Sequence, residues 1–245
     1  MLAILGGSGL TRLGNLKITQ RRSLSTPYGQ PSAALTFGEL AGRDVIFLAR
    51  HGDRHTLAPH EVNYRANLWA LKEAGAGEVI SVASVGGIRD ATAPGTLVVP
   101  HQIIDYTWGR ASTFFEGPGA PVKHIDFTEP YSAALRERLL GAARGCGEVV
   151  LDRGVYAATQ GPRLETAAEI DRLARDGADV VGMTAMPEAA LAREIDLEYG
   201  AITVVANYAA GRGDSARAVP LERIEAILEQ ALGRVRRILE RMCET

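Results

Sequence analysis

The chain has few of the residues that mark metal centres, disulfide-rich folds or membrane spans. It contains 2 cysteines among 245 residues, Cys146 and Cys243, which lie far apart and lack the spacing of metal ligands. They are interpreted as incidental thiols in a reducing compartment. No uninterrupted apolar stretch approaches the ~20 residues of a membrane span, and segment 1–5 has no basic lead-in of a signal peptide. These absences predict a soluble, cytoplasmic protein.

An excess of charge of either sign is also lacking. The formal net charge is −2 and the isoelectric point is about 6.2, which excludes nucleic acid or an anionic membrane as the main partner. Positive charge is carried almost wholly by arginine; this suits phosphate recognition, although a GC-rich genome explains it equally well. The hydrophobic content of 46% is enough to bury a core as one domain, residues 1–245.

Apolar segments of two kinds alternate along the chain. Short buried runs predict strands at 2–5, 33–40, 44–50, 79–85, 96–104, 154–159, 179–183 and 201–206. Helical spacing predicts helices at 61–75, 131–145, 165–177, 187–198 and 220–242. The alternation predicts a single α/β domain with a mixed central sheet flanked by helices. The irregular stretches 105–130 and 207–219 are candidate binding loops or subunit contacts.

Small or polar groups follow several predicted strand ends, where α/β sheets bind ligands. The run 6–9, Gly-Gly-Ser-Gly, favours an anion site at Ser8 or else a plain turn. Residues 50–55 form a cationic corner suited to phosphate, or else a solvated loop. Its Arg-His-Gly start also occurs in histidine phosphatases, so a phosphoryl-transfer enzyme using His51 is an alternative hypothesis. In that family, however, the motif follows the first strand of the chain.

Three further polar residues stand at predicted element boundaries. Glu165 is either a ligand group or a carboxylate favoured by a helix N-terminus, and Thr184 lies between two methionines that are typical of a core. Asn207 ends the apolar run 201–206, and its amide can both donate and accept. Neither a Ser-His-Asp order nor a Cys-His pair stands out in the sequence. The inventory therefore suits a reaction whose nucleophile comes from solution, such as phosphate.

An ordered series of motifs covers nearly the whole chain. It comprises GGSGL at 6–10, TPYGQPS at 26–32, LARHG at 48–52, NYRANLWALKEAG at 63–75, GPRLET at 161–166, GMTAMPEAALARE at 182–194 and Asn207-Tyr208. Taken together these motifs resemble the purine nucleoside phosphorylase family, in its branch with methylthioadenosine phosphorylase. The resemblance implies a nucleoside phosphorylase-like fold and a homotrimer whose active sites are completed by a neighbouring subunit. It implies a purine nucleoside and phosphate as the two substrates, without a metal or organic cofactor.

The resemblance also implies a role for individual residues. The phosphate site carries over to Ser8, Arg50, His51, the amide of Ser84, and Thr184. Met183 carries over to the ribose, which it would hold by backbone contact. The family branch often has threonine at the position of Ala83, so one hydroxyl contact to phosphate is expected to be missing. Catalysis would then consist mainly of positioning and charge stabilisation as the purine leaves an oxocarbenium-like sugar.

At the base the chain departs from the methylthioadenosine enzymes. They have aspartate at the positions of Asn207 and Ala209 and serine at the position of Glu165. Asn207, the expected catalytic group, would donate to O6 and accept from N7–H of a purine, while Glu165 would accept from N1–H. Adenine has an unprotonated N1 and an amino donor, and does not match. The resemblance therefore implies a 6-oxopurine, hypoxanthine or guanine.

At the sugar the chain resembles the methylthioadenosine enzymes. Val219 and Leu221 align with residues of a 5′-methylthio pocket, and His124 of a neighbouring subunit aligns with a residue that closes it. S-Methyl-5′-thioinosine is therefore the expected substrate. The alternatives within the family are a general 6-oxopurine nucleoside phosphorylase, a methylthioadenosine phosphorylase and a non-catalytic nucleoside-binding relative.

Overall fold

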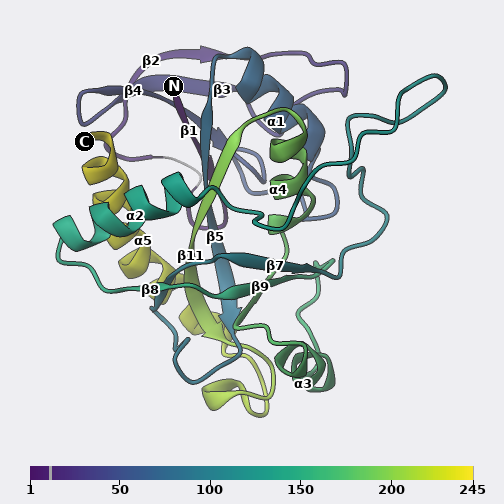
Figure 1. The fold of residues 1–245 in the computed structure, drawn as a ribbon. Coiled ribbons are helices and arrows are strands. Elements are labelled where there is room, and N and C mark those ends of the chain that lie inside the picture. Colours follow the sequence, from purple (N-terminus) through teal and green to yellow (C-terminus); the bar gives the residue numbers. More distant parts are fainter. Residues whose placement is uncertain (11–12, 245) are drawn as a thin grey trace.

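A branched mixed sheet runs through the middle of the molecule (Figure 1). The fold is a computed structural model that describes residues 1–10 and 13–244. One path of hydrogen-bonded neighbours runs in the order β2 (Lys17–Arg22), β3 (Leu35–Leu40), β4 (Arg43–Ala49), β1 (Leu2–Gly6), β5 (Glu78–Gly87), β10 (Val180–Gly182), β9 (Val155–Ala158) and β7 (Gln102–Asp105). A second branch leaves β5 through β11 (Glu198–Tyr208), β6 (Leu97–Val99) and β8 (Val150–Asp152).

The central strands are parallel, which brings their ends together. β1 pairs in parallel with both β4 and β5, and β5 pairs in parallel with β11. β10 runs antiparallel to the end of β5, with Val181 opposite Gly86. All five residues of β1 and most of β11 are buried, as expected for central strands covered on both faces. The carboxyl ends of β1, β4, β5 and β11 therefore meet at one edge of the sheet.

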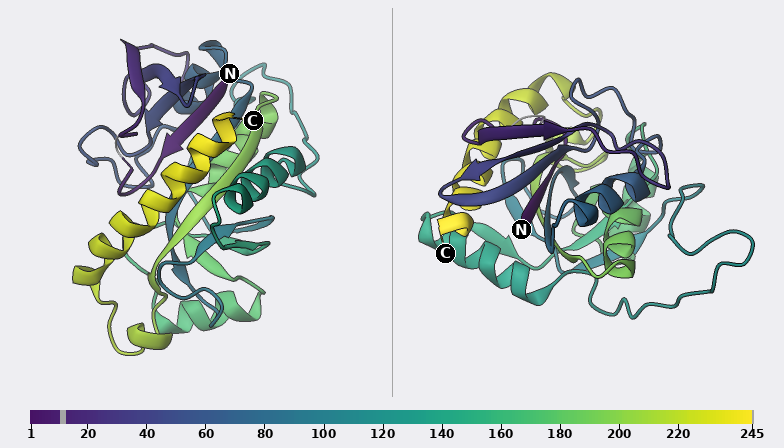
Figure 2. Two further views of the ribbon diagram at one scale, coloured as in Figure 1. Left: turned by 90° about the vertical axis from the view of Figure 1, so that its left-hand side faces the viewer. Right: turned by 90° about the horizontal axis from the view of Figure 1, so that it is seen from above.

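Helices cover the sheet on both faces (Figure 1). α1 (Tyr64–Glu73) and α4 (Ala185–Glu194) pack together on one face, and α2 (Ala133–Gly145) and α5 (Leu221–Glu244) on the other. Figure 2 shows α5 crossing the long central strands diagonally. α3 (Ala167–Arg175) packs beside β9 and β10, and the short 3₁₀ helix η1 (Gly213–Ser215) follows β11. No helix within the described ranges is both long and apolar enough to cross a membrane.

Side-chain caps explain where several helices begin. Asn63 accepts a hydrogen bond from the backbone N–H of Ala66 at the start of α1. Thr166 forms a reciprocal capping box with Glu169 at the start of α3. Such caps satisfy backbone donors that the helix itself leaves unpaired. The start of α3 is thereby fixed directly after the segment that carries Glu165.

The predicted fold class is confirmed, and several element bounds are corrected. The prediction of one strand over 96–104 is wrong, because β6 and β7 are separate strands with different partners, and Pro100 and His101 between them belong to neither strand. Proline lacks the N–H that a continuous ladder needs. β2 and β8 were not predicted: β2 is exposed at every residue, and β8 spans 3 residues. The predicted helix 187–198 ends at Glu194, and β11 starts at Glu198.

Candidate active site

A cavity of about 470 Å³ opens where the central strands end. That volume suits a small organic molecule. The predicted site residues that line it are Ser8, Arg50, His51, Ser84, Glu165, Met183, Thr184, Asn207, Ala209 and Val219. They come from segments far apart in the sequence, so the sheet assembles them. Leu221 and His124 lie outside this lining; the side chain of Leu221 is 63% exposed, and His124 is exposed on the connection between β7 and α2.

The turn after β1 brings backbone close to the buried end of the cavity. A Cβ atom at Gly7 would lie 2.6 Å from the carbonyl oxygen of Val82 and 2.9 Å from Nη1 of Arg50. Glycine is therefore the residue that permits this approach. Ser8 follows, and its hydroxyl oxygen lies 2.8 Å from Nε2 of His55.

Arg50 is fully buried beneath this end of the cavity and is paired with a carboxylate of α4. Its Nε donates to Glu188 Oε2 at 2.6 Å, and its Nη2 donates to Glu188 Oε1 at 3.0 Å. Burial alone would lower the pKa of Arg50, but the Glu188 carboxylate outweighs it and holds the pKa above its ordinary value. Nη1 donates to the carbonyl of Val82 and has a second hydrogen left. Arg50 therefore offers the cavity one N–H rather than a free charge.

His51 lies beside Arg50 with its ring fixed by the backbone. Nδ1 is 2.8 Å from the carbonyl oxygen of Leu57. A carbonyl oxygen only accepts, so Nδ1 carries the hydrogen. Burial, followed by the neighbouring Arg50 charge, lowers the pKa of His51 to about 4. The ring is therefore neutral at neutral pH.

The cationic corner at 50–55 divides in the structure. Asp53 and Arg54 line a separate hollow beside β2 and β3, whereas His55 lines the same cavity as His51. His55 has a positive φ of 54°, which is uncommon for a residue with a side chain. No individual role was predicted for His55, because neither this backbone conformation nor the contact with Ser8 follows from residue spacing.

The contact between Ser8 and His55 has the distance of a nucleophile and its base, a pairing that sequence analysis did not find. Nδ1 of His55 has no hydrogen-bond partner within the described residues, and the ring is exposed. Hydrolases of the Ser-His type need a third group that orients the imidazole. The pair therefore lacks the arrangement of a hydrolase, and it suits a hydroxyl held for binding.

The opposite end of the cavity carries an amide and a carboxylate. The pairing of β11 with β5 slips at Ala206, where a bulge forms just before Asn207; bulges commonly re-aim side chains at sites. Nδ2 of Asn207 donates to the carbonyl of Tyr208 at 2.6 Å, which leaves one N–H and Oδ1. Thr159 donates its hydroxyl to Oε1 of Glu165 at 2.6 Å. The amide of Asn207 and the carboxylate of Glu165 are therefore each held in one orientation by a hydrogen bond within the protein.

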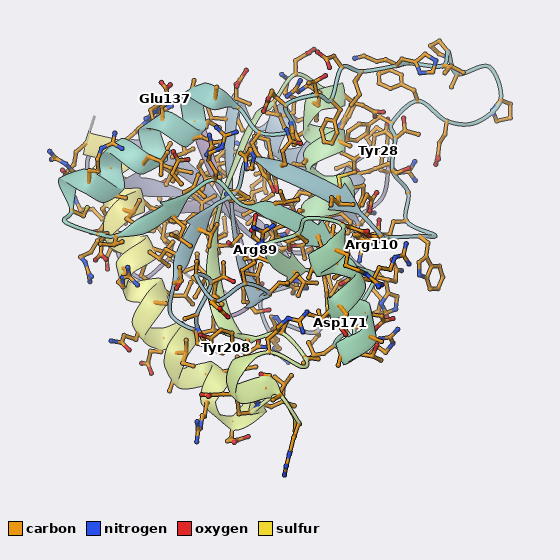
Figure 3. The ribbon with its side chains drawn as sticks, turned by 60° about the horizontal axis from the view of Figure 1, so that its bottom comes forward. Tyr28, Arg89, Arg110, Glu137, Asp171 and Tyr208 are labelled. Atoms are coloured by element: carbon orange, nitrogen blue, oxygen red, sulfur yellow. The ribbon has the colours of Figure 1, made fainter. Side chains whose placement is uncertain are left out.

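Arg110 ties together the two segments that carry the middle of the site. It comes from the long connection between β7 and α2, which projects from the body of the molecule in Figure 2 and is labelled at Arg110 in Figure 3. Its guanidinium donates to the carbonyls of Met183 at 2.8 Å, Met186 at 2.6 Å and Gln160 at 2.8 Å. Arg110 was not predicted from the sequence, since most of its partners are backbone carbonyls of segments far away in the chain.

An apolar wall completes the cavity near the start of α5. Val219 and Ile224 line it, together with Leu57 from the loop after β4. Ile224 was not predicted; it lies three residues beyond Leu221 and lines the cavity, whereas Leu221 does not. Within the described residues, no group of three or more His, Cys, Asp or Glu side chains could hold a metal ion.

Comparison with known proteins places this architecture in a family. The family model described as "Phosphorylase superfamily" matches residues 1–244. The chain belongs to the phosphorylase superfamily. One relative in the superfamily is a probable S-methyl-5′-thioinosine phosphorylase of Pseudomonas syringae pv. tomato, 54% identical over 240 residues, which are 98% of this chain and 97% of the relative. The resemblance drawn from the motifs is thereby confirmed.

Other relatives are named for different substrates. A 6-oxopurine nucleoside phosphorylase of Pyrococcus furiosus is 45% identical over 215 residues, which are 86% of this chain and 80% of that protein. The structure of methylthioadenosine phosphorylase from Schistosoma mansoni in complex with adenine superposes with a TM-score of 0.94 at 31% identity. That comparison covers 99% of this chain and 90% of the other. The phosphorylase fold is therefore shared across relatives with different bases.

Proposed function

We propose that this protein catalyses the phosphorolysis of S-methyl-5′-thioinosine to hypoxanthine and 5-methylthioribose 1-phosphate. The proposal rests on the hydrogen-bond donors and acceptors at the end of the cavity that holds Asn207 and Glu165. Asn207 retains one N–H and Oδ1, Glu165 presents a carboxylate, and Ala209 supplies no acceptor. This pattern matches O6, N7–H and N1–H of a 6-oxopurine and mismatches adenine.

The reaction needs a nucleophile, a leaving group and a place for one proton. An oxygen of hydrogen phosphate bonds to C1′ as the C1′–N9 bond breaks, and the bonding electrons move to the purine. Hydrogen phosphate loses one proton overall and the purine gains one, so the charges balance. Oδ1 of Asn207 accepts from N7–H and stabilises the departing base, while the site holds phosphate against the cationic sugar.

The phosphate and sugar assignments follow the lining of the cavity. Ser8, Arg50, His51, the amide of Ser84 and Thr184 bind phosphate in this proposal. In this proposal Met183 lies under the ribose, and Val219 with the newly found Ile224 receives the thiomethyl group. Leu221, which is outside the lining of the cavity, would contribute from its rim. Burying a methylthio group there contributes about 1–2 kcal/mol, whereas a 5′-hydroxyl is left poorly paired.

We place the enzyme in the cytoplasm as a homotrimer in which His124 of one subunit closes the sugar pocket of the next. His124 lies on the exposed connection between β7 and α2, outside its own subunit's cavity. Sedimentation equilibrium tests the assembly. A mass near three times the 26.1 kDa of one chain supports it, and a monomer at assay concentrations contradicts it.

Turnover of three nucleosides tests the function. We expect phosphate-dependent cleavage of S-methyl-5′-thioinosine to exceed that of inosine and of methylthioadenosine. Faster inosine cleavage would sink the sugar assignment, and faster methylthioadenosine cleavage would overturn the base assignment. Purine release that does not require phosphate, with a phosphohistidine trapped on His51, would instead favour the phosphoryl-transfer alternative. Tight binding without turnover would favour a non-catalytic relative.

A further inference from the structure

We propose that Thr159 turns the carboxylate of Glu165 so that it offers a bound purine one oxygen, which selects hypoxanthine over guanine as the leaving base. Thr159 is a positioning residue, because it acts on the ligand only through Glu165. This inference rests on the proposed phosphorolysis of a 6-oxopurine nucleoside and narrows which 6-oxopurine the same site accepts.

The backbone of Thr159 is held from two sides. The residue directly follows β9, and its N–H donates to the carbonyl oxygen of Gly182 at 2.8 Å. Its own carbonyl oxygen accepts from Nη2 of Arg110 at 3.3 Å. The end of β10 and the long connection between β7 and α2 therefore fix the place from which the threonine hydroxyl acts.

Glu165 stands between two cavities. It lines the cavity of the candidate active site and also a second cavity of about 420 Å³, whereas Thr159 lines only the second. The Thr159 hydroxyl lies 2.6 Å from Oε1 of Glu165 and 3.3 Å from the carbonyl oxygen of Gly182. It has one hydrogen, which goes to the nearer carboxylate oxygen. Oε1 is thereby turned toward the second cavity, and Oε2 is the oxygen left for a ligand in the active site.

No cation competes with Thr159 for this carboxylate in the described part of the chain. Arg163 lies two residues before Glu165, but its two terminal nitrogens donate to Glu169 at 2.8 Å and 2.7 Å. An arginine fork would bind both oxygens of Glu165 at once. A single hydroxyl binds one of them and leaves Oε2 available.

The number of N–H groups on one edge of the purine then decides the fit. Hypoxanthine has N1–H alone on this edge, whereas guanine has N1–H and a 2-amino group that point the same way. Oε2 of Glu165 accepts from N1–H of either base. The amino group of guanine needs a second acceptor beside the first, and Oε1 is turned away by Thr159. An unpaired amino group in the closed site lowers affinity by about tenfold.

Two nucleosides that differ only in the 2-amino group test the inference. The probes are S-methyl-5′-thioinosine and S-methyl-5′-thioguanosine. Calorimetry without phosphate measures binding alone, and steady-state kinetics with phosphate measure kcat/KM. We expect the wild-type protein to prefer the thioinosine by at least about tenfold in both measurements. Equal affinity of the wild-type protein for the two nucleosides would overturn the proposal.

The variant Thr159→Val removes the hydroxyl and keeps the shape of the side chain. The freed carboxylate can turn both oxygens toward the ligand, so we expect the preference to fall to about one, through weaker thioinosine binding and stronger thioguanosine binding. Thr159→Ser keeps a hydroxyl donor and should retain most of the preference. Thr107→Val is the matched control, since Thr107 donates to Asp105 at 2.7 Å on the exposed connection and lines neither cavity.

The outcomes separate this inference from the proposed function. A tenfold preference that persists in a folded Thr159→Val protein would place the discrimination in the shape of the cavity and contradict the inference. An equal loss of preference in the Ser and Val variants would contradict it as well, because a hydroxyl would then not suffice. Selective binding of the thioinosine without phosphate-dependent cleavage would contradict only the proposed function. Cleavage of both nucleosides at equal kcat/KM would contradict only this inference.

Discussion

At the scale of single residues, the proposed function makes the choice of base depend on the side-chain amide of Asn207. Asn207 donates one N–H to the carbonyl of Tyr208, so its remaining N–H and its Oδ1 are held in a fixed orientation. Aspartate at this position has no N–H to donate to O6. We expect Asn207→Asp to lower kcat/KM for S-methyl-5′-thioinosine and to shift its ratio to methylthioadenosine by about 100-fold, with Glu165 still opposing adenine.

Steady-state kinetics on both nucleosides measure this shift. Asn15→Asp is the control, because Asn15 bonds to Glu240 of α5, away from the cavity lining. An unchanged ratio in Asn207→Asp would show that the side chain does not read the base.

The hydroxyl of Ser8 depends on a neighbour across the cavity mouth. Nε2 of His55 lies 2.8 Å from Ser8 Oγ, so an Nε2–H donated to Oγ leaves the hydroxyl hydrogen free for an anion. We expect His55→Phe to raise the KM for phosphate about tenfold with little change in the KM for the nucleoside. His55→Gln, which keeps an N–H donor, should restore much of the loss, and the exposed His60→Phe serves as control. Equal losses in the Phe and Gln variants would argue against the orienting role.

The residue types at strand ends could be predicted from the sequence, but their partners could not. The predicted Ser8, Arg50 and Asn207 all line the cavity, because parallel strands place their carboxyl ends at one edge. In the sequence, Glu188 is indistinguishable from an ordinary carboxylate in the first turn of a helix. Only the packing of α4 against the sheet brings it to Arg50. Residue spacing carries no information about such long-range contacts.

At the scale of elements, the long connection between β7 and α2 braces the site through Arg110. That side chain donates to the carbonyls of Gln160 and Met183, which belong to the two separate segments that would hold the base and the sugar in the proposed function. We expect Arg110→Ala to raise the KM for the nucleoside about tenfold and to lower stability by about 1–3 kcal/mol. Phosphate affinity should change little, because no phosphate-site side chain bonds Arg110 in the described structure.

Arg163→Ala is the matched control for this prediction. Arg163 is in the same region, but its side chain is 68% exposed and pairs with Glu169 at the surface, where ion pairs contribute little. A loss of stability in Arg110→Ala without a rise in the nucleoside KM would mean that Arg110 supports the fold alone.

Elements were predictable where burial imposes a pattern. β1, β5 and β11 are apolar runs that the sequence marks clearly. β2 has the polar sequence KITQRR and is exposed throughout, so it becomes a strand by pairing with β3 rather than through its own pattern. The division of 96–104 into β6 and β7 likewise depends on which neighbours each half finds.

At the scale of the whole molecule, His51 links the site to stability. The unfolded chain protonates this residue near pH 6.5, whereas the folded chain does so near pH 4 because of burial and the Arg50 charge. Between these values the unfolded state holds more protons, so the stability contributed by the neutral ring is complete above pH 6.5 and is lost as the pH falls through about 4. The contribution amounts to at most about 3 kcal/mol.

Urea unfolding of the wild-type and His51→Gln proteins between pH 4 and 7 measures this contribution as a difference. We expect the wild-type free energy of unfolding to fall more steeply toward acid than that of the variant. Parallel curves would show that His51 does not titrate with the lowered pKa.

We propose that this member of the phosphorylase superfamily cleaves a 6-oxopurine thiomethyl nucleoside. The most direct test is a competition between S-methyl-5′-thioinosine and methylthioadenosine at equal concentration, with phosphate present and both free purines quantified. The ratio of products gives the ratio of kcat/KM, which removes errors in enzyme concentration. We expect hypoxanthine to exceed adenine by at least about 100-fold. Adenine released at an equal or greater rate would contradict the account.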